Sequence, residues 1–305
     1  AAGDFGAISV VQPVPTLKSD LERSTDWPPA KVVSGKAWIG CETDYALQGD
    51  GAPLRNLEFF SVLDAMTACQ QKGVVRLRYT GKIAGDFTTL VERISEMATR
   101  LDIPKRILDI DSSGGQVEAA IAAGDAMAEA HWTIWVREDA VCHSACVLVL
   151  AAGDNRLIAG KVGVHRIIRL QSTATSRADL NRELADVFAQ MKSYLERNGA
   201  DAAVAELMMT IPNRSLRLLT ASELIQFGLD GPNAAQDDLD RIRLARDCGE
   251  KFVRRHDAFN RAFEQECATA NRDVEGKNRC GLMLRARFGF PGKVCRKESP
   301  LAEFD

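Results

Sequence analysis

Residues 76–117 read RLRYTGKIAGDFTTLVERISEMATRLDIPKRILDIDSSGGQV, a strand, a helix, a second strand and a glycine turn in that order. The segments 74–81 and 106–111 have the short apolar pattern of strands. Between them, apolar residues recur at helical spacing, which predicts an amphipathic helix over 85–101. These residues are Phe87, Leu90, Val91, Ile94 and Met97. The order predicts two parallel strands joined by a crossover helix.

The same alternation continues to about residue 230. Further helices are predicted over 116–130, 144–152, 176–198, 201–211 and 219–229, and further strands over 131–136, 155–160 and 162–167. Thr220 and Glu223 have the spacing of a capping box at the start of the last helix. The chain is therefore predicted to be an α/β protein with a largely parallel sheet in this region.

The two ends of the chain differ from this middle part. Residues 1–35 contain repeated prolines, which predict an extended arm, and a strand over 36–42 and a helix over 54–73 are expected next. Residues 238–270 are charged and helical in pattern, and a loop containing Cys280 and Cys295 is expected after them. We therefore predict an N-terminal arm and helical extension over 1–73, a main domain over 74–230, and a helical, cysteine-rich appendage pinned by disulfides over 231–305.

Composition and charge exclude several classes of partner. The net charge of −3 over 305 residues gives no field that would draw the chain to nucleic acid. No apolar run approaches the roughly 18 residues that a membrane-spanning helix needs. We expect neither a nucleic-acid partner nor an integral membrane segment.

Eight cysteines point to an oxidising compartment. They are Cys41, Cys69, Cys142, Cys146, Cys248, Cys267, Cys280 and Cys295. No two of them form a CxxC pair and only four histidines occur, so a metal site is not expected. Disulfides in a periplasmic or secreted protein are the favoured interpretation, and buried free thiols are the alternative. The first residues, AAGDFGAISVVQPVP, fit a mature chain whose signal peptide has been removed, or a shortened chain.

A glycine pair lies where a strand turns into a helix. Gly114 and Gly115 allow close approach of the backbone to a ligand, and their N–H groups can face an anion. Neither the G-x-G-x-x-G fingerprint nor a Walker A loop is present. No cofactor is expected.

Ser144 lies in DAVCHSACVLVLAAG, residues 139–153, where a loop leads into an apolar helix. The following N–H, of Ala145, could stabilise an oxyanion there. His165, in GKVGVHRI, lies 21 residues further on at a strand end and could act as the base that a serine nucleophile needs. Taken singly, each has a structural interpretation, a packing serine and a satisfied strand histidine.

These segments, in this order, resemble the Clp protease proteolytic subunit and its crotonase-fold relatives. The resemblance covers residues 74–230 and implies a ClpP/crotonase-like core, a ββα superhelix. It implies that Ser144 is the nucleophile, that His165 is the general base, and that Gly115 and Ala145 supply the oxyanion hole beside Gly114. The form CHSAC resembles predicted periplasmic members with a C-x-S-A-C serine segment.

The third member of the triad departs from the family pattern. The resemblance places the family aspartate at Leu216, and the nearest polar residues are Asn213 and Ser215. The site is therefore a dyad, an Asn- or Ser-supported triad, or a decayed site. Lys161 and Lys192 are candidates for the Ser–Lys dyad of related signal-peptide peptidases.

Two functions remain open from the sequence. The first is a serine hydrolase, with a peptidase as the first expectation, acting on a peptide or protein substrate and forming homo-oligomers as its relatives do. The second is a catalytically weak or inactive binding or scaffold protein of the cell envelope, which the missing aspartate favours. Cys142 and Cys146 flank the serine, either as a disulfide across the turn or as two buried thiols, and neighbouring His143 matches no catalytic role.

Overall fold

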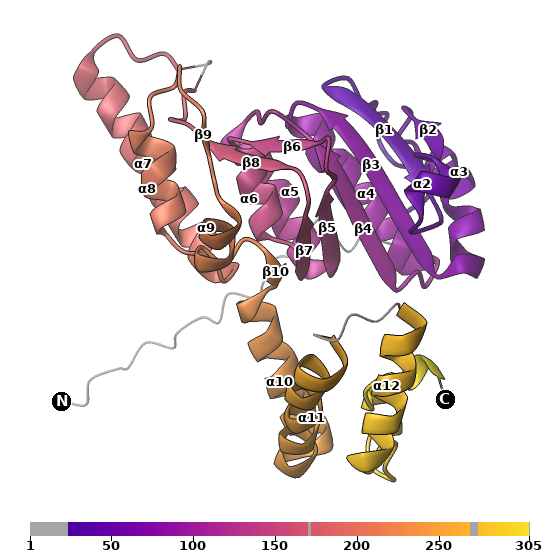
Figure 1. Ribbon diagram of the computed structural model, residues 1–305. Coiled ribbons are helices and arrows are strands. Elements are labelled where there is room, and N and C mark those ends of the chain that lie inside the picture. The colour runs from indigo at the N-terminus through magenta and orange to yellow at the C-terminus, as the bar shows by residue number, and fades with distance from the viewer. Residues whose placement is uncertain (1–23, 170–171, 269–273, 305) are drawn as a thin grey trace, which may run out of the picture. The chain divides into compact units, whose positions relative to one another are not determined.

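The computed structural model describes residues 24–169, 172–268 and 274–304 (Figure 1). The chain forms two compact units, Ala1–Asn233 and Ala234–Asp305. Residues 1–23 of the expected arm lie outside the described residues. No helix among the described residues has the length and apolar character to cross a membrane.

The first unit contains a seven-stranded sheet in the order β10-β7-β5-β4-β3-β1-β2. Its strands are β1 (Gly35–Gly40), β2 (Ala52–Leu54), β3 (Val74–Gly81), β4 (Lys105–Asp111), β5 (Trp132–Val136), β7 (Asn155–Ile158) and β10 (Gly231–Pro232). The four central strands, β3, β4, β5 and β7, run parallel, as the alternating pattern predicts. β1 pairs antiparallel with β3, so part of the expected N-terminal extension shares the sheet of the main domain.

A second, three-stranded sheet has the order β6-β8-β9, with β6 (Val141–His143), β8 (Lys161–Val164) and β9 (Arg217–Leu218). β6 and β8 are parallel, and β9 is antiparallel to β8. The sequence analysis predicts β8 but neither β6 nor β9, because strands of two or three residues carry too little periodicity.

The helices of this unit are α2 (Tyr45–Gln48), α3 (Phe59–Lys72), α4 (Gly85–Arg100), α5 (Val117–Glu129), α6 (Cys146–Ala151), α7 (Arg177–Arg197), α8 (Ala203–Thr210) and α9 (Ala221–Gln226). All five apolar residues predicted on the inner face of α4 are fully buried. The predicted capping box of α9 is confirmed, since Thr220 and Glu223 each cap the other's backbone.

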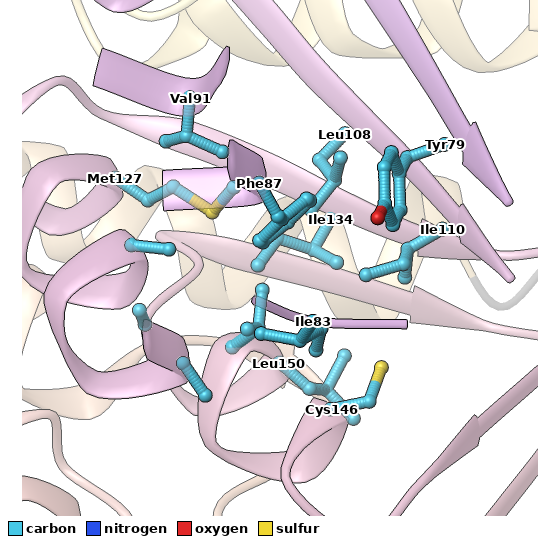
Figure 2. Packing of buried hydrophobic residues seen from close by; sticks show 14 of the residues in the cluster. Tyr79, Ile83, Phe87, Val91, Leu108, Ile110, Met127, Ile134, Cys146 and Leu150 are labelled. Carbon is cyan, nitrogen blue, oxygen red and sulfur yellow. The ribbon is translucent and has the colours of Figure 1, made fainter. Parts of the chain in front are cut away.

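Side chains from the large sheet and from the helices form one core. Figure 2 shows residues of β3, β4 and β5 gathered with residues of α4, α5 and α6. The rings of Tyr79 and Phe87 lie 4.6 Å apart between centroids. Cys146 and Leu150 of α6 belong to the same core, so the helix that follows Ser144 is anchored in the close-packed interior of the unit.

A buried ionic cluster lies within the large sheet. Asp109 of β4 is fully buried and pairs with Arg78 at 2.7 Å, with Arg76 at 3.4 Å, and with Arg137. Arg137 also pairs with Asp50 at 2.8 Å. Three guanidinium groups thus share one buried carboxylate, which satisfies a charge that would otherwise be costly to bury.

The second unit is a small helical domain. It contains α10 (Ala234–Cys248), α11 (Glu250–Phe263), a π-helical turn (Glu264–Ala268), α12 (Val274–Arg287) and two 3₁₀ turns, Arg296–Glu298 and Ala302–Phe304. Disulfides Cys248–Cys295 and Cys267–Cys280 close it around an aromatic core. The loop expected at Cys280 is wrong, because this cysteine lies within α12. Gly281, which suggested a loop, allows α12 to pack closely, since a Cβ there would fall 2.8 Å from Phe263.

The remaining disulfides, Cys41–Cys69 and Cys142–Cys146, lie in the first unit. All eight cysteines are therefore paired, in agreement with the predicted disulfides. Four disulfides are typical of proteins that fold in an oxidising compartment.

Candidate active site

Strands β6 and β8 bring Ser144 and His165 to neighbouring positions. In the parallel register His143 lies opposite Gly163, so Ser144 follows the end of β6 while His165 follows the end of β8. The Ser144 N–H donates to the Gly163 carbonyl at 2.9 Å and fixes this alignment. By this register Ser144 is level with Val164, and His165 follows one residue further along the neighbouring strand, about 4.8 Å away.

Ser144 has an unusual backbone. Its φ is +58°, in the left-handed region that residues other than glycine rarely adopt, and its side chain is almost completely buried. The residue forms the bend between β6 and α6, and the Cys142–Cys146 disulfide spans this bend with a Cα–Cα distance of 5.2 Å. A sharp strand-to-helix turn also carries the nucleophilic serine of α/β-hydrolases.

The glycine turn lies against Ser144. Gly114 has φ +98°, and its N–H donates to Ser112 Oγ at 3.1 Å. A Cβ built on Gly114 would lie 2.7 Å from the Ser144 Cβ and 3.2 Å from the Ala145 nitrogen. Only glycine permits this approach, which places the predicted anion-binding turn directly beside the serine and the Ala145 N–H.

Two backbone donors, one beside Ser144 and one in the glycine turn, have no hydrogen-bond partner in the described part of the chain. Within the residues that the structure describes, neither the Gly115 N–H nor the Ala145 N–H makes a hydrogen bond. Their neighbours do, since the Gln116 N–H donates to Ile83 and the Ser144 N–H donates to Gly163. These two free donors are the pair that the resemblance assigns to the oxyanion hole.

His165 is oriented by the backbone rather than by a carboxylate. Its Nδ1 lies 3.0 Å from the Arg166 carbonyl, so Nδ1 must carry the proton and Nε2 is left with a free lone pair. The Asn213 side-chain amide donates to the same carbonyl at 3.1 Å, and its nitrogen lies 3.5 Å from His165 Nδ1. The structure thus brings Asn213 to His165. Ser215 is exposed, and no hydrogen bond from it to His165 occurs in the described part of the chain.

The serine and the histidine are close in the fold but not hydrogen-bonded. Among the described residues, no hydrogen bond joins Ser144 Oγ to the ring of His165. The expected direct contact is therefore absent in this conformation. Catalytic hydrogen bonds are often longer without substrate and tighten when substrate binds.

His143 lies beside this pair, although the sequence analysis assigns it no catalytic role. Its ring lies against Gly163, since a Cβ built on Gly163 would be 3.2 Å from His143 Cδ2. Its Nε2 is buried and makes no hydrogen bond in the described part of the chain. Burial, His165 and Lys161 lower the pKa of His143, and Asp111 opposes this change. The neutral imidazole is therefore the favoured form near neutral pH.

The lysine candidates lie at the edge of the site or outside it. Lys161 is exposed at the start of β8, opposite Val141 and three residues before the level of Ser144. Lys192 is exposed on α7. Among the described residues, no group of three or more histidine, cysteine or acidic side chains is arranged to hold a metal ion.

Comparison with protein-family models finds no match, and comparison with curated proteins finds none. Solved structures that resemble part of the chain include a mutant of the 1510-N membrane-bound stomatin-specific protease. It is 18% identical, and the match covers 55% of this chain and 81% of that chain at a TM-score of 0.42. A second mutant of that protease, in complex with a substrate peptide, is 20% identical over 52% of this chain and 72% of that chain, with a TM-score of 0.41.

Proposed function

We propose that the protein is a serine hydrolase with a ClpP/crotonase-like core, acting on peptide or protein substrates. The observation that carries this proposal is the unpaired N–H of the buried Ala145 next to a serine held in a left-handed turn, against the glycine turn that carries the Gly115 N–H. Buried backbone donors are nearly always paired, so the unpaired N–H of the fully buried Ala145 indicates a ligand that accepts from it, and the N–H of the exposed Gly115 is open to the same ligand. A developing oxyanion is such a ligand.

The reaction follows from these positions. Ser144 Oγ attacks the substrate carbonyl carbon while its proton passes to His165 Nε2, which the Arg166 carbonyl keeps in the accepting tautomer. The Gly115 and Ala145 N–H groups hold the oxyanion of the tetrahedral intermediate. The C–N bond then breaks as the His165 proton passes to the leaving amine, and an acyl-enzyme on Ser144 remains. Water, deprotonated by His165, releases the acid and restores the serine.

The third position of the triad is filled by neutral groups in this proposal. A backbone carbonyl and the Asn213 amide fix the ring of His165, but neither stabilises an imidazolium as well as a carboxylate does. We therefore propose a slow hydrolase rather than a fast one, active in the periplasm or outside the cell, where four disulfides would persist. Self-association is part of this proposal through the family resemblance alone.

The alternative function is a binding or scaffold protein that keeps the fold. The absent Ser144–His165 hydrogen bond and the absent carboxylate at the third position favour it. The two functions differ in one measurable property, which is whether Ser144 reacts with an electrophile.

The test is labelling of the full-length protein with a fluorophosphonate probe, read by intact mass and by the mass of the modified peptide. Wild type and Ser61→Ala, a control serine on α3, are expected to gain one label on the peptide containing residue 144, and Ser144→Ala to gain none. No label on folded wild type at any pH between about 6 and 9 would contradict a hydrolase and leave the scaffold function. A label that persists in Ser144→Ala would contradict the assigned nucleophile.

A further inference from the structure

The bend that carries Ser144 is closed by a disulfide at its two ends. Cys142 is the central residue of β6 and Cys146 is the first residue of α6, and both are fully buried. Only His143, Ser144 and Ala145 lie between them. This is the shortest of the four disulfide loops, with a sequence separation of 4 compared with 13, 28 and 47 for the others.

Both ends of this disulfide are attached to fixed elements. The Cys142 backbone pairs with Val162 of β8 on one side and with Ser112 on the other. Cys146 begins a helix in which every residue is buried. The three intervening residues therefore connect two residues that are held by the fold. The disulfide further restricts the distance between Cys142 and Cys146.

The conformation enclosed by the disulfide is costly for Ser144. A left-handed φ in a residue with a side chain persists only where the surroundings impose it. The peptide plane between Ser144 and Ala145 carries the free Ala145 N–H. A change in the Ser144 backbone would therefore move the nucleophilic oxygen and turn this donor at the same time.

We propose that the Cys142–Cys146 disulfide is a positioning element for catalysis, which holds the Ser144 bend and the Ala145 N–H in the reactive arrangement. The two cysteines do not touch the reacting atoms. They act through the backbone of Ser144, so the protein is active with this disulfide formed and impaired when it is absent. This inference rests on the proposed hydrolase function and adds to it a dependence on one particular disulfide.

The Cys41–Cys69 disulfide supplies a matched control. It lies in the same unit and joins the residue after β1 to α3, and neither element pairs with β6 or β8. It closes a loop of separation 28, and a longer loop gives the larger stabilisation through restriction of the unfolded chain. Removal of Cys41–Cys69 should therefore affect stability more, and removal of Cys142–Cys146 should affect reactivity more.

The experiment compares full-length wild type, C142A/C146A and C41A/C69A. Fluorophosphonate labelling is followed over a range of probe concentrations, which separates the maximal labelling rate from the half-saturating concentration. In the labelling step the Ser144 Oγ–P bond forms as the P–F bond breaks, fluoride leaves and the hydroxyl proton passes to His165. The thermal midpoint of each protein is measured in parallel.

We expect C142A/C146A to lose about 10- to 100-fold in maximal labelling rate, since loss of a single oxyanion donor costs about 10²–10³-fold in other hydrolases. Its half-saturating concentration should change by less than about threefold and its thermal midpoint should fall less than that of C41A/C69A. C41A/C69A should label within about twofold of wild type. C142V/C146A, which fills the strand position with a β-branched residue, serves as a second variant where the alanine pair folds poorly.

Three results would overturn the inference. One is a maximal rate within about twofold of wild type in either folded variant that lacks Cys142–Cys146. Another is an equal loss in C41A/C69A, which would mean that general stability is responsible. The third is a crystal structure of C142V/C146A in which Ser144 keeps its left-handed φ. Wild type that does not label at all would overturn the proposed function as well, so the two failures are distinguished by wild type alone.

Discussion

The first unit contains two polar clusters that differ in how completely their groups are paired. Around Asp109, three arginines and Asp50 form a network in which the buried carboxylate contacts each guanidinium group, and the buried Arg137 Nε makes no hydrogen bond in the described part of the chain. Around Ser144, two backbone N–H groups and the Nε2 of His143 have no partner in the described part of the chain. A folded protein pairs the polar groups it needs for stability, and unpaired groups gathered at one place indicate a ligand that pairs them.

The comparison predicts that substitutions at the two clusters have different consequences. At the paired cluster, substitutions should change the free energy of unfolding. Reactivity should fall only to the extent that less of the protein is folded. At the unpaired cluster, reactivity should change and stability should hardly change. Four predictions test this division, in order of decreasing effect.

Ser144→Ala should show the largest effect. Peptide hydrolysis should fall by about 10³-fold or more, because the nucleophile is absent, while the thermal midpoint should stay within a few degrees of wild type. Steady-state hydrolysis of a peptide library and thermal unfolding measure the two quantities. Loss of folding in this variant would show that Ser144, like Asp109, is needed for stability, and it would contradict the proposed difference between the two clusters.

Asp109→Ala should destabilise the protein by about 3–5 kcal/mol, since it leaves the buried guanidinium groups of Arg76 and its neighbours uncompensated. Urea unfolding monitored by tryptophan fluorescence measures this change. Asp125→Ala, which removes an exposed ion pair with Arg197, is the matched control and should cost less than about 1 kcal/mol. Equal effects in the two variants would show that the Asp109 cluster is not a structural network.

Asn213→Ala should lower the maximal rate of hydrolysis about three- to tenfold, the cost of about one neutral hydrogen bond that helps to fix the His165 ring. The unfolding midpoint should not change, because the side chain is exposed. Ser215→Ala is the control from the same loop and should behave as wild type. A larger loss in Ser215→Ala than in Asn213→Ala would assign the third position to the serine.

His143→Gln should have the smallest effect, seen in the pH dependence of stability. The folded protein lowers the pKa of His143, chiefly by burial, so the unfolded chain binds a proton more readily. Wild-type stability from this group is complete above the ordinary histidine pKa of about 6.5 and is lost as the pH falls through it. Urea unfolding at several pH values between about 5 and 8 should give a shallower dependence in the variant. An unchanged slope would contradict the burial of a neutral His143.

The sequence predicts the parts of this fold that repeat a pattern over many residues. The helix of Phe87, Leu90 and Val91 follows from its spacing. The proposed site residues Ser144, His165, Gly115 and Ala145 come from the order of short segments that resemble a family, and they stay a prediction. The helix pattern and the order of segments each rest on many positions, so one atypical residue does not change either prediction.

The rest depends on contacts that leave no local signal. The Arg166 carbonyl that orients His165 is a backbone group, present at every residue and therefore invisible in a sequence. The choice between Asn213 and Ser215 depends on the path of one loop, and residue spacing does not specify it. The eight cysteines allow 105 connectivities, and only the folded chain selects one.

The parallel register of β6 and β8 sets the relative position of Ser144 and His165, the proposed nucleophile and base. Side chains alternate between the two faces of a strand, so a shift of β8 by one position would carry His165 to the opposite face of the small sheet. Gly160, which fits tightly under the Arg137 and Ala140 carbonyls just before β8, leaves no room for such a slip. A one-residue deletion between Gly160 and His165 should therefore abolish acylation, and it should also lower the thermal midpoint because Val162 and Val164 of β8 are buried. Lengthening the loop of 173–175, beyond the histidine, should be harmless. Chain length should therefore be tolerated differently in the two places, least of all across the four residues between Gly160 and His165.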